Sequence, residues 1–433
     1  MVGAGGAVEV TGGVRALVRA AGVIAAAGVA ALSTTCKYGE VTVVQPAAKG
    51  SGALVLSIQT DGEDAAVAQQ LGWSAGIPGA DVTIAPGDGD TAVGPPIATL
   101  VTDSAGKVSV ADLPDGKYFV QVRRLLTSAE LAQLAPGEDA VGFMTQTVLD
   151  RGSASLSVPA SHRRSIVISE WSFVPLAIPN VGGYTYGGYL ELANNSDTTV
   201  YLDGLVVGSG LLTWVDPRVP CEALEPVGND PDGVWADRFD SLPGTGHTYP
   251  LAPGAVAVIA TDAIDHSAIT PEGLDLTQAD FEGIGTADVD NPSVPNTVTI
   301  GPRAWFLDHG LLFWGGLVQV VFVALPVDTA ALPKQVLFAT AWPFDRVPRG
   351  KILDVVTLAA NWGPFPGLCP WGLVNRNFDR RSAQILQFQV GKGQYSIQRL
   401  VAFTRPDGRK VLQDTRTSNV DLFVGPRTPF RLP

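Results

Sequence analysis

Short runs of alternating apolar and polar residues begin just after residue 51. Each run is rich in Val, Ile, Leu, Tyr or Phe and is bounded by Gly, Pro or Asp, which is the pattern of β-strands joined by tight turns. The runs are Ala53–Gln59, Ala80–Ile84, Ala98–Thr102, Lys107–Val110 and Tyr118–Val122. Together they predict a small β-sandwich.

One segment of this region departs from the strand pattern. Thr127–Gly137 (TSAELAQLAPG) contains Ser128 near its start, and serine is a residue type that caps helices. We therefore expect a short helix, capped by Ser128, before the last strands of the sandwich.

A second series of strand-like runs begins near Ser165. Ile166–Glu170 comes first, and Gly188–Leu192 and Val256–Ile259 follow after turn residues. The most apolar run of the chain is Leu311–Leu325, but Gly315-Gly316 and Gln319 interrupt it and its length is marginal for a membrane helix. Two consecutive buried strands fit this run better than a membrane span.

Composition supports an all-β fold. Of the 433 residues, 46% are hydrophobic and only 16% are charged, with 49 Gly and 32 Pro, which suits short strands and tight turns better than long solvated helices. The length allows two or three domains. The formal net charge of -13 opposes binding to nucleic acid, because such binding depends on clustered Lys and Arg.

The first residues have the order of a signal peptide. Arg15 and Arg19 precede the uncharged run Ala20–Leu32, and small residues lead to Cys36. That run is shorter than the roughly 20 residues that cross a bilayer as a helix. We expect residues 1–36 to be a signal peptide that is removed on export.

A run of small residues that ends in one cysteine resembles the lipobox of bacterial lipoproteins. The resemblance implies that Cys36 carries the lipid, although Leu32 and Thr35 depart from the family's preferred residues. The alternative is ordinary cleavage nearby. Residues 37–51 then form a tether between membrane and first domain.

Two cysteines remain after Cys36. Cys221 and Cys369 both lie in Pro-containing loops, and an even number of cysteines outside the cytoplasm allows a disulfide between them. The sequence does not place their Cα atoms within bonding range, so the bridge stays one of two possibilities.

The segment VTDSAGKVSVADLPDGKYFVQV, residues 101–122, contains two turn signals separated by strand runs. It resembles the carboxypeptidase-regulatory, or prealbumin-like, immunoglobulin-like sandwich. The resemblance covers residues 52–157. It implies a spacer role for this domain.

The second domain, residues 165–433, carries several separated phrases of known families. IVISE, GYLEL and LAPG resemble the lamin-tail type of sandwich, here with long loops. ATDAIDHS, LDLTQADFE, DVDNPSVPN, SIQRL and LQDTRTSNVDL resemble domain of unknown function family 4876. That resemblance implies a Gram-negative surface lipoprotein without an established activity, associated with outer-membrane uptake systems.

An acidic stretch is the best candidate for a metal site. Asp288, Asp290 and Asn291 present several oxygen atoms within one loop, as Ca²⁺ requires, although the pattern is not that of an EF-hand. The alternative is an Asx-rich turn before Pro292. A calcium cofactor is thus possible, and no other cofactor is expected.

Aromatic residues around a Gly-rich loop are a second candidate site. Trp171, Tyr184, Tyr186 and Tyr189 surround NVGGYTYGGY, and this composition suits an amphipathic surface for a sugar or a protein partner. Packing of the loop over the core is the alternative.

Local catalytic motifs are missing from the sequence: none of the four histidines has metal-binding spacing, and there is no nucleophile elbow or phosphate loop. Asp262, Asp265 and His266 lie close together, but a capped turn explains them better than half of a site. Glu170 and Glu191 are strand carboxylates that need partners if buried, and Arg399 is a candidate partner.

Three functions follow as hypotheses. The first is a non-catalytic binding lipoprotein of the cell surface that assists an outer-membrane β-barrel transporter, attached to the membrane only through its lipid. The second is a structural or adhesive surface module. The third is a hydrolase that uses dispersed carboxylates such as Asp262, Asp290 and Asp308.

Overall fold

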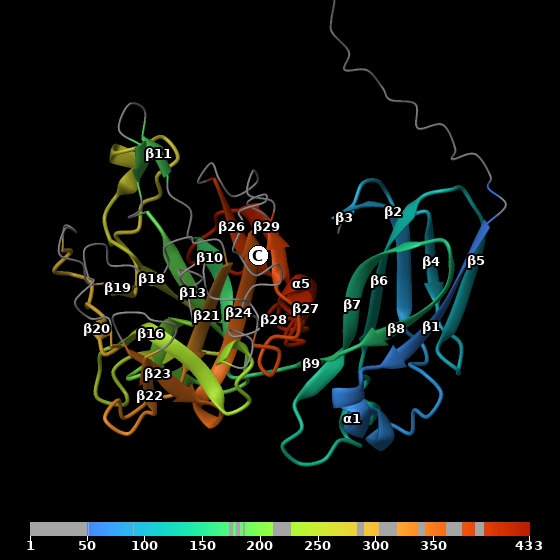
Figure 1. The fold of residues 1–433 in the computed structure, drawn as a ribbon, viewed down its shortest axis with the longest axis horizontal. Coiled ribbons are helices and arrows are strands. Elements are labelled where there is room, and N and C mark those ends of the chain that lie inside the picture. Colours follow the sequence, from blue (N-terminus) through green and yellow to red (C-terminus); the bar gives the residue numbers. More distant parts are fainter. Residues whose placement is uncertain are drawn as a thin grey trace, which may run out of the picture. The chain divides into compact units, whose positions relative to one another are not determined.

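The computed structural model describes most of the chain after residue 49. The described residues are 50, 52–89, 91–172, 176–178, 182–184, 187–210, 227–283, 290–302, 318–336, 343–360, 375–385 and 394–433. Residues Lys49–Pro433 belong to one compact unit. Their regular structure is a set of β-sheets with a few short helices, so the predicted all-β sandwich fold is confirmed (Figure 1).

Residues 52–162 form two sheets around one core. The strands are β1 (Gly52–Thr60), β2 (Asp81–Asp88), β3 (Thr91–Ala92), β4 (Ala98–Val101), β5 (Lys107–Leu113), β6 (Lys117–Leu125), β7 (Ala140–Asp150), β8 (Gly152–Val158) and β9 (Ala160–His162). One sheet has the order β5-β1-β8. The other has the order β3-β2-β6-β7-β9, with β4 also paired to β2. Each strand run predicted for this region overlaps one of these strands, although Ala80 precedes β2 and Thr102 follows β4.

Alternation along the strands builds this first core. Leu54, Leu56 and Ile58 point to one face of β1 and are buried, and they share a cluster with Val120 and Val122 of β6 in the opposite sheet. Each fully buried Leu or Val contributes about 1.5–3 kcal/mol relative to an exposed one.

Short helices connect the strands of the first sandwich: η1 (Gly62–Asp64), α1 (Ala65–Gln70) and α2 (Ser128–Leu131). The helix predicted after Thr127 is present, but its cap is Thr127, so the prediction of Ser128 as the cap is wrong. Thr127 has the extended backbone of a cap, and its hydroxyl accepts from the Glu130 amide at 3.2 Å. Glu130 in turn accepts from the Thr127 amide at 2.7 Å, which completes a capping box.

Residues 166–426 supply a second, larger pair of sheets. The strands are β10 (Ile166–Ser172), β13 (Tyr189–Asn194), β15 (Val206–Gly210), β16 (Gly233–Ser241), β18 (Val256–Ala260), β19 (Phe281–Glu282), β20 (Val298–Thr299), β21 (Val318–Ala324), β22 (Lys334–Val336), β23 (Pro343–Pro348), β24 (Ile352–Ala360), β25 (Ala383–Ile385), β26 (Tyr395–Arg399) and β29 (Leu422–Pro426). One sheet has the order β19-β18-β13-β10-β26-β29. The other has the order β22-β23-β16-β15-β21-β24-β25, with β20 paired to β16.

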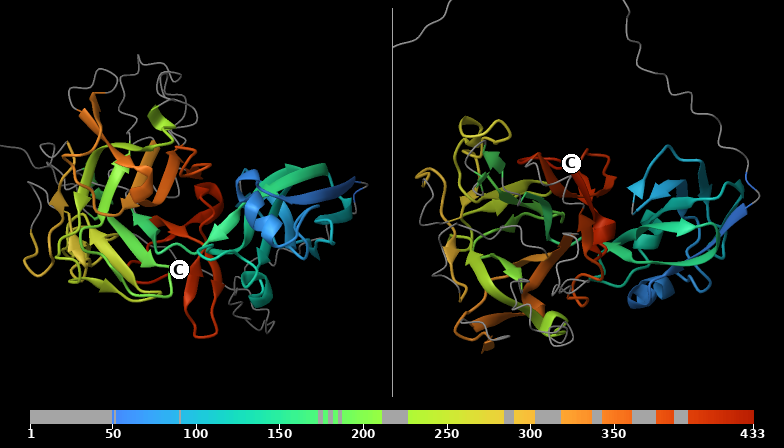
Figure 2. Two further views of the ribbon diagram at one scale, coloured as in Figure 1. Left: turned by 90° about the horizontal axis from the view of Figure 1, so that it is seen from below. Right: turned by 45° about the horizontal axis from the view of Figure 1, so that its top comes forward.

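Smaller elements complete this region. Two-stranded sheets form from β11 (Leu176–Ile178) and β12 (Gly182–Tyr184), from β14 (Val200–Tyr201) and β17 (Pro250–Leu251), and from β27 (Val401–Thr404) and β28 (Lys410–Leu412). The short helices are η2 (His266–Ala268), η3 (Arg349–Lys351) and α5 (Ser418–Asp421). Figure 2 shows the strands of residues 52–162, in blue to teal, and those of residues 166–426, in green to red, as separate sets of sheets.

The second core lies between the two larger sheets. Leu190 and Leu192 of β13 share one buried cluster with Val321 and Val323 of β21, which belongs to the other sheet. Of the apolar run 311–325, Val318–Ala324 forms the strand β21, and the first half lies outside the described residues. No helix in the described ranges is long and apolar enough to cross a membrane.

A buried ion pair joins these two sheets at an irregularity in β10. The register of β10 against β13 shifts between Ile168 and Glu170. The Ile168 amide donates to Asp354 Oδ2 at 2.8 Å, and Arg399 Nε donates to the Ile168 carbonyl at 2.8 Å. Arg399 Nη2 and Asp354 Oδ2 are 2.6 Å apart. The two side chains therefore satisfy backbone groups of the irregular position as well as each other.

Candidate functional site

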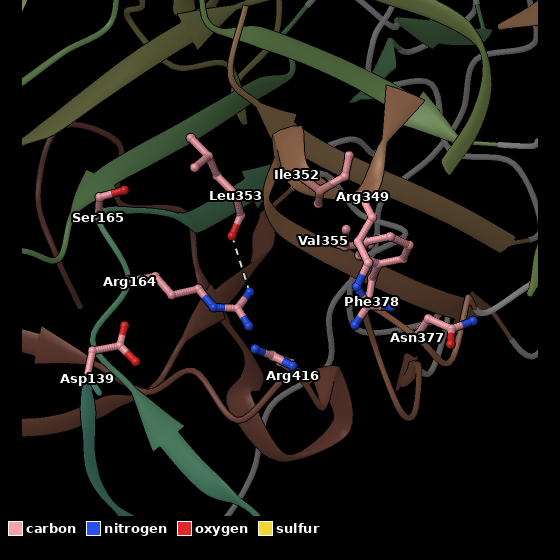
Figure 3. A pocket seen from close by; sticks show the side chains of 10 residues that line it. All are labelled: Asp139, Arg164, Ser165, Arg349, Ile352, Leu353, Val355, Asn377, Phe378 and Arg416. Carbon is pink, nitrogen blue, oxygen red and sulfur yellow. Dashed lines mark hydrogen bonds between the residues drawn. The ribbon is translucent and has the colours of Figure 1, made fainter. Parts of the chain in front are cut away.

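The candidate site is a cavity of about 320 Å³ bordered by three arginines (Figure 3). It lies where the segment after β9 meets the start of β24 and the turn after β28. Its lining residues are Asp139, Arg164, Ser165, Arg349, Ile352, Leu353, Val355, Asn377, Phe378 and Arg416. Its volume is in the range of pockets that hold small molecules.

Arg164 is held by two contacts at the cavity wall. Its Nε lies 3.1 Å from Asp414 Oδ2, and its Nη1 donates to the Leu353 carbonyl at 3.2 Å, as Figure 3 shows. Asp414 is buried and its pKa is lowered, because the arginines Arg164 and Arg399 together outweigh the cost of its burial. Arg164 thus keeps one amino group, Nη2, for a further partner.

Arg416 has the least compensated charge in the cavity. Its Nε is buried without a hydrogen-bond partner, and within the described part of the chain no ion pair includes its guanidinium. Burial lowers the pKa of Arg416 and the nearby positive charge of Arg164 lowers it further, whereas the negative charge of Asp414 partly opposes these effects. In Figure 3 the guanidinium groups of Arg164 and Arg416 face one another. An anion between them would relieve this repulsion.

The backbone around Arg416 fixes its position. Arg416 has a φ of 55°, the left-handed region that is unusual for a residue with a side chain. Its carbonyl accepts from the Arg380 amide at 2.7 Å, and Asp421 accepts from the amides of Thr415 and Thr417 on either side. These bonds hold the turn in a conformation that would otherwise cost free energy.

Arg349 and Phe378 form the opposite side of the cavity. The Arg349 guanidinium lies 5.3 Å from the centre of the Phe378 ring, a cation–π contact, and its Nη1 donates to the Pro231 carbonyl at 3.3 Å. Ile352 and Val355 of β24 add aliphatic surface next to this ring. One side of the cavity therefore carries Arg164 and Arg416, and the opposite side combines Arg349 with apolar surface.

Asp139 is the one carboxylate in the lining, and it is paired with His162. His162 Nδ1 lies 2.8 Å from Asp139 Oδ1, and its Nε2 lies 3.7 Å from Asp64 Oδ1. Burial disfavours the charged imidazole, but its hydrogen bonds to Asp139 and Asp64 outweigh burial and raise the pKa of His162 to about 9. Burial would raise the pKa of Asp139, but the bond from His162 lowers it.

Asp139 and His162 also belong to a group of side chains that could hold a metal ion. Glu138, Asp139 and His162 each offer one atom, and these atoms lie within 4.8 Å of one another. His162 Nδ1 lies 3.4 Å from Glu138 Oε1 and 2.8 Å from Asp139 Oδ1, so the three side chains form an ion pair. Because the pKa of His162 is raised, a metal ion would have to displace its proton.

The chemistry that this arrangement offers is binding of a negatively charged group. Arginines remain protonated and do not transfer protons at neutral pH, and Asp139 is occupied by His162. Ser165 contributes a hydroxyl, but no base in the described lining accepts its proton. The cavity is thus suited to holding a ligand.

Two of the four aromatic residues predicted as a binding surface are in the core. Trp171 and Tyr189 are buried, with exposed fractions of 1% and 0%, so the interpretation of these two residues as ligand contacts is wrong. They lie on β10 and β13, where the sheet packs into the core, and the predicted alternative of core packing applies to them. Tyr186 and the side chain of Tyr184 lie outside the described residues.

Glu170 and Glu191 are buried, but Arg399 is not the partner of Glu170, which corrects the prediction. Glu170 accepts from the hydroxyls of Tyr189 and Ser396 and from the Thr428 amide. Arg399 pairs with Asp354 instead. Neutral donors and the C-terminal segment therefore satisfy the carboxylate.

The described residues of the acidic loop form a turn. Asn291 Oδ1 accepts from the Ser293 amide at 3.1 Å, and Asp290 Oδ1 accepts from the Asn296 side chain at 2.8 Å. This is the Asx turn that the sequence left open as the alternative. Asp288 lies outside the described residues, and the calcium site stays a prediction.

The segment Asp262–His266 forms a turn, as the sequence predicted. Asp265 caps η2, and His266 Nε2 lies 2.9 Å from the Asp262 carbonyl, so the capped turn predicted there is present. Cys36, Cys221 and Cys369 lie outside the described residues, and so does Asp308. The lipid attachment, the disulfide and the hydrolase remain predictions.

The cavity itself was not predicted. Arg164 and Ser165 stand at the expected domain junction, and Arg416 lies within LQDTRTSNVDL, a phrase that carried only a family resemblance. The three arginines are far apart in sequence, at 164, 349 and 416, and no spacing rule connects them. The Arg163-Arg164 pair gave no distinctive signal, because the chain is acidic overall and also contains the pairs Arg123-Arg124 and Arg380-Arg381.

Comparison with known proteins gives the fold and no function. No family model and no curated protein matches the chain by sequence. One solved structure, the major pilin subunit BcpA of Bacillus cereus, aligns with 69% of this chain and 96% of its own chain at 12% identity. Its TM-score of 0.17 is too low for any argument. A DUF4876 family protein from Bacteroides thetaiotaomicron aligns over 88% of this chain and 98% of its own, with 15% identity and a TM-score of 0.51. The chain therefore shares the fold of a solved member of the uncharacterised DUF4876 family, the family that its separated phrases resemble.

Proposed function

We propose that this chain is an exported lipoprotein, anchored through Cys36 to a Gram-negative envelope, that binds a small ligand for an outer-membrane uptake system without transforming it. The signal-peptide order of residues 1–36 supports export. The observation that carries the binding role is the cavity in which Arg416 has no ion pair among the described residues and a buried Nε without a hydrogen-bond partner. Arg416 is half-buried, and removing part of a cation from water costs free energy that a ligand of opposite charge would offset.

The experiment compares the wild type with Cys36→Ser and Arg416→Gln in the native host. Mature mass, membrane fractionation and co-purified proteins are measured for each. We expect the wild type to carry an acyl mass, to sediment with the membrane and to recover a β-barrel protein. Cys36→Ser loses all three, and Arg416→Gln keeps the anchor because its change is in the cavity.

A different result contradicts the proposal. If the wild type and Cys36→Ser are both soluble, unacylated and recovered alone, the chain is a freely secreted module. If the wild type is anchored but no transporter is recovered with it, the uptake role is wrong and only the anchor stands.

A structural or adhesive role is the second candidate, and one observation favours it. Val93, Ile97 and Val101 are exposed at the β3 and β4 edge of the first sandwich, with exposed fractions of 61%, 42% and 60%. Exposed β-branched residues at a sheet edge favour association with other chains. Ile97→Lys with Val101→Lys would abolish binding to envelope proteins in this case and leave the ligand affinity of the cavity unchanged.

A further inference from the structure

We infer that the arginine-lined cavity is selective for a monoanionic carboxylate attached to a compact apolar or aromatic body. This inference rests on the proposed binding function and names its ligand class. It follows from the charge balance of the lining and from the apolar surface that lies opposite Arg164 and Arg416.

The charge balance allows one negative charge. Arg416 is unpaired within the described residues, whereas Arg164 shares Asp414 with Arg399. Arg349 lies over the Phe378 ring on the other side. Asp139 and Asp414 already have cationic partners, His162 for the first and Arg164 with Arg399 for the second. The charge left for a ligand on this side is therefore that of Arg416, and a single negative charge matches it.

The shape of a carboxylate matches the free donors. Arg416 presents a planar guanidinium whose paired N–H groups can bind both oxygens of one carboxylate. Arg164 adds Nη2, because its Nε and Nη1 already have partners. Ser165, next to Arg164 in the sequence, also lines the cavity. A planar anion between the two arginines would therefore receive donors from both.

The opposite side accommodates the rest of the ligand. Ile352, Val355 and Phe378 provide aliphatic and aromatic surface continuous with the core of the second sandwich. Such surface binds apolar groups by excluding water from them. A ligand without an apolar body would leave this side hydrated and would bind weakly, and a ligand without a charge would leave Arg416 uncompensated.

The test is calorimetric titration of the purified full chain with four probes. They separate the contribution of the ligand's negative charge from that of its apolar or aromatic group. Benzoate carries both features, benzyl alcohol lacks the charge, acetate lacks the body, and phenyl phosphate replaces the carboxylate with a phosphate. We expect benzoate to bind about tenfold or more tightly than each of the other three, as loss of one charge-assisted contact or of one buried ring would produce.

Matched variants locate the binding. Arg416→Gln should weaken benzoate binding about tenfold or more, whereas Arg123→Gln, which removes an exposed arginine of β6, should leave it unchanged. Thermal unfolding verifies that each variant folds. If Arg416→Gln does not fold, Arg416→Lys keeps the charge but not the paired N–H groups and should still lose several-fold in affinity.

Each titration result that differs from these expectations overturns a stated part of the inference. Tighter binding of phenyl phosphate than of benzoate overturns the carboxylate class but leaves the proposed binding function in place. Equal binding of acetate and benzoate overturns the apolar body. Failure of all four probes to bind at up to about 10 mM overturns the inference as a whole, because weaker affinities would not fill a pocket in use. The anchor and the transporter are tested separately by Cys36→Ser in the host.

Discussion

Arg399 on β26 and Asp354 on β24 form a buried ion pair, 2.6 Å between Nη2 and Oδ2, that joins the two sheets of the larger sandwich. Both side chains also bond to the backbone of Ile168. Asp414 and Asp421 lie 3.7 Å from the same guanidinium. One arginine therefore compensates several buried carboxylates, and Asp414 connects this network to Arg164 in the cavity.

Removal of this arginine should destabilise the fold strongly. Arg399→Met leaves Asp354 without its partner and is expected to cost about 3–5 kcal/mol, the range for breaking a buried pair on one side. Denaturant unfolding measures the change. The control is Arg163→Gln at the partly exposed pair with Asp197, where a loss below about 1 kcal/mol is expected. If both variants lost a similar amount of unfolding free energy, the buried ion-pair network would contribute no more to stability than the partly exposed pair.

The pair of His162 with Asp139 and Asp64 makes stability depend on pH. The pKa of His162 is raised from 6.5 to about 9, so its contribution is fully present below pH 6.5 and is lost as the pH rises through about 9. The contribution is on the order of 3 kcal/mol. Urea unfolding between pH 6 and about 9.5 should therefore show a decline that His162→Gln flattens.

The control for this experiment is His247→Gln, a change at an exposed histidine, which should keep the decline of the wild type. If His162→Gln and the wild type decline in parallel, the ion pair is not the source of the pH dependence.

Buried Glu191 is a second source of pH dependence. Burial, and then the negative charge of Glu170, raise the pKa of Glu191 from 4.5 to about 8, although Ser169 donates a hydrogen bond to it. Its contribution is present below pH 4.5 and is lost as the pH rises through about 8. Glu191→Gln imitates the protonated form, so its stability relative to the wild type should increase between about pH 5 and 8. A constant difference over this range would mean that Glu191 is ionised in the folded protein.

The helix α2 provides a test of cap assignment at adjacent residues. Thr127→Ala removes the hydroxyl that accepts from the Glu130 amide and should cost about 1 kcal/mol. Ser128→Ala changes a residue inside the helix and should cost little. Thermal or urea unfolding of the two variants distinguishes them, and a larger loss for Ser128→Ala would reverse the assignment.

The sequence by itself determined the strand pattern. Alternation of apolar and polar residues in runs such as Ala53–Gln59 and Tyr118–Val122 specifies strands. Side chains two positions apart in a strand point to the same face, so such a run has one face to bury. Turn signals such as Asp115-Gly116 specify where strands end for the same local reason. The capped turn at Asp265 and the Asx turn at Asn291 were also predictable, since their hydrogen bonds join residues only two apart.

Tertiary structure alone decided the burial of particular aromatics and the partners of charges. Trp171 and Tyr189 are residue types that are common on binding surfaces, but the packing of β10 and β13 places them in the core. Arg399 meets Asp354 because β26 and β24 belong to sheets that face each other, and no sequence interval predicts this contact. The cavity has the same origin. Arg164, Arg349 and Arg416 come from three segments far apart in sequence, and their positive charges gather only where the folded backbone brings those segments together.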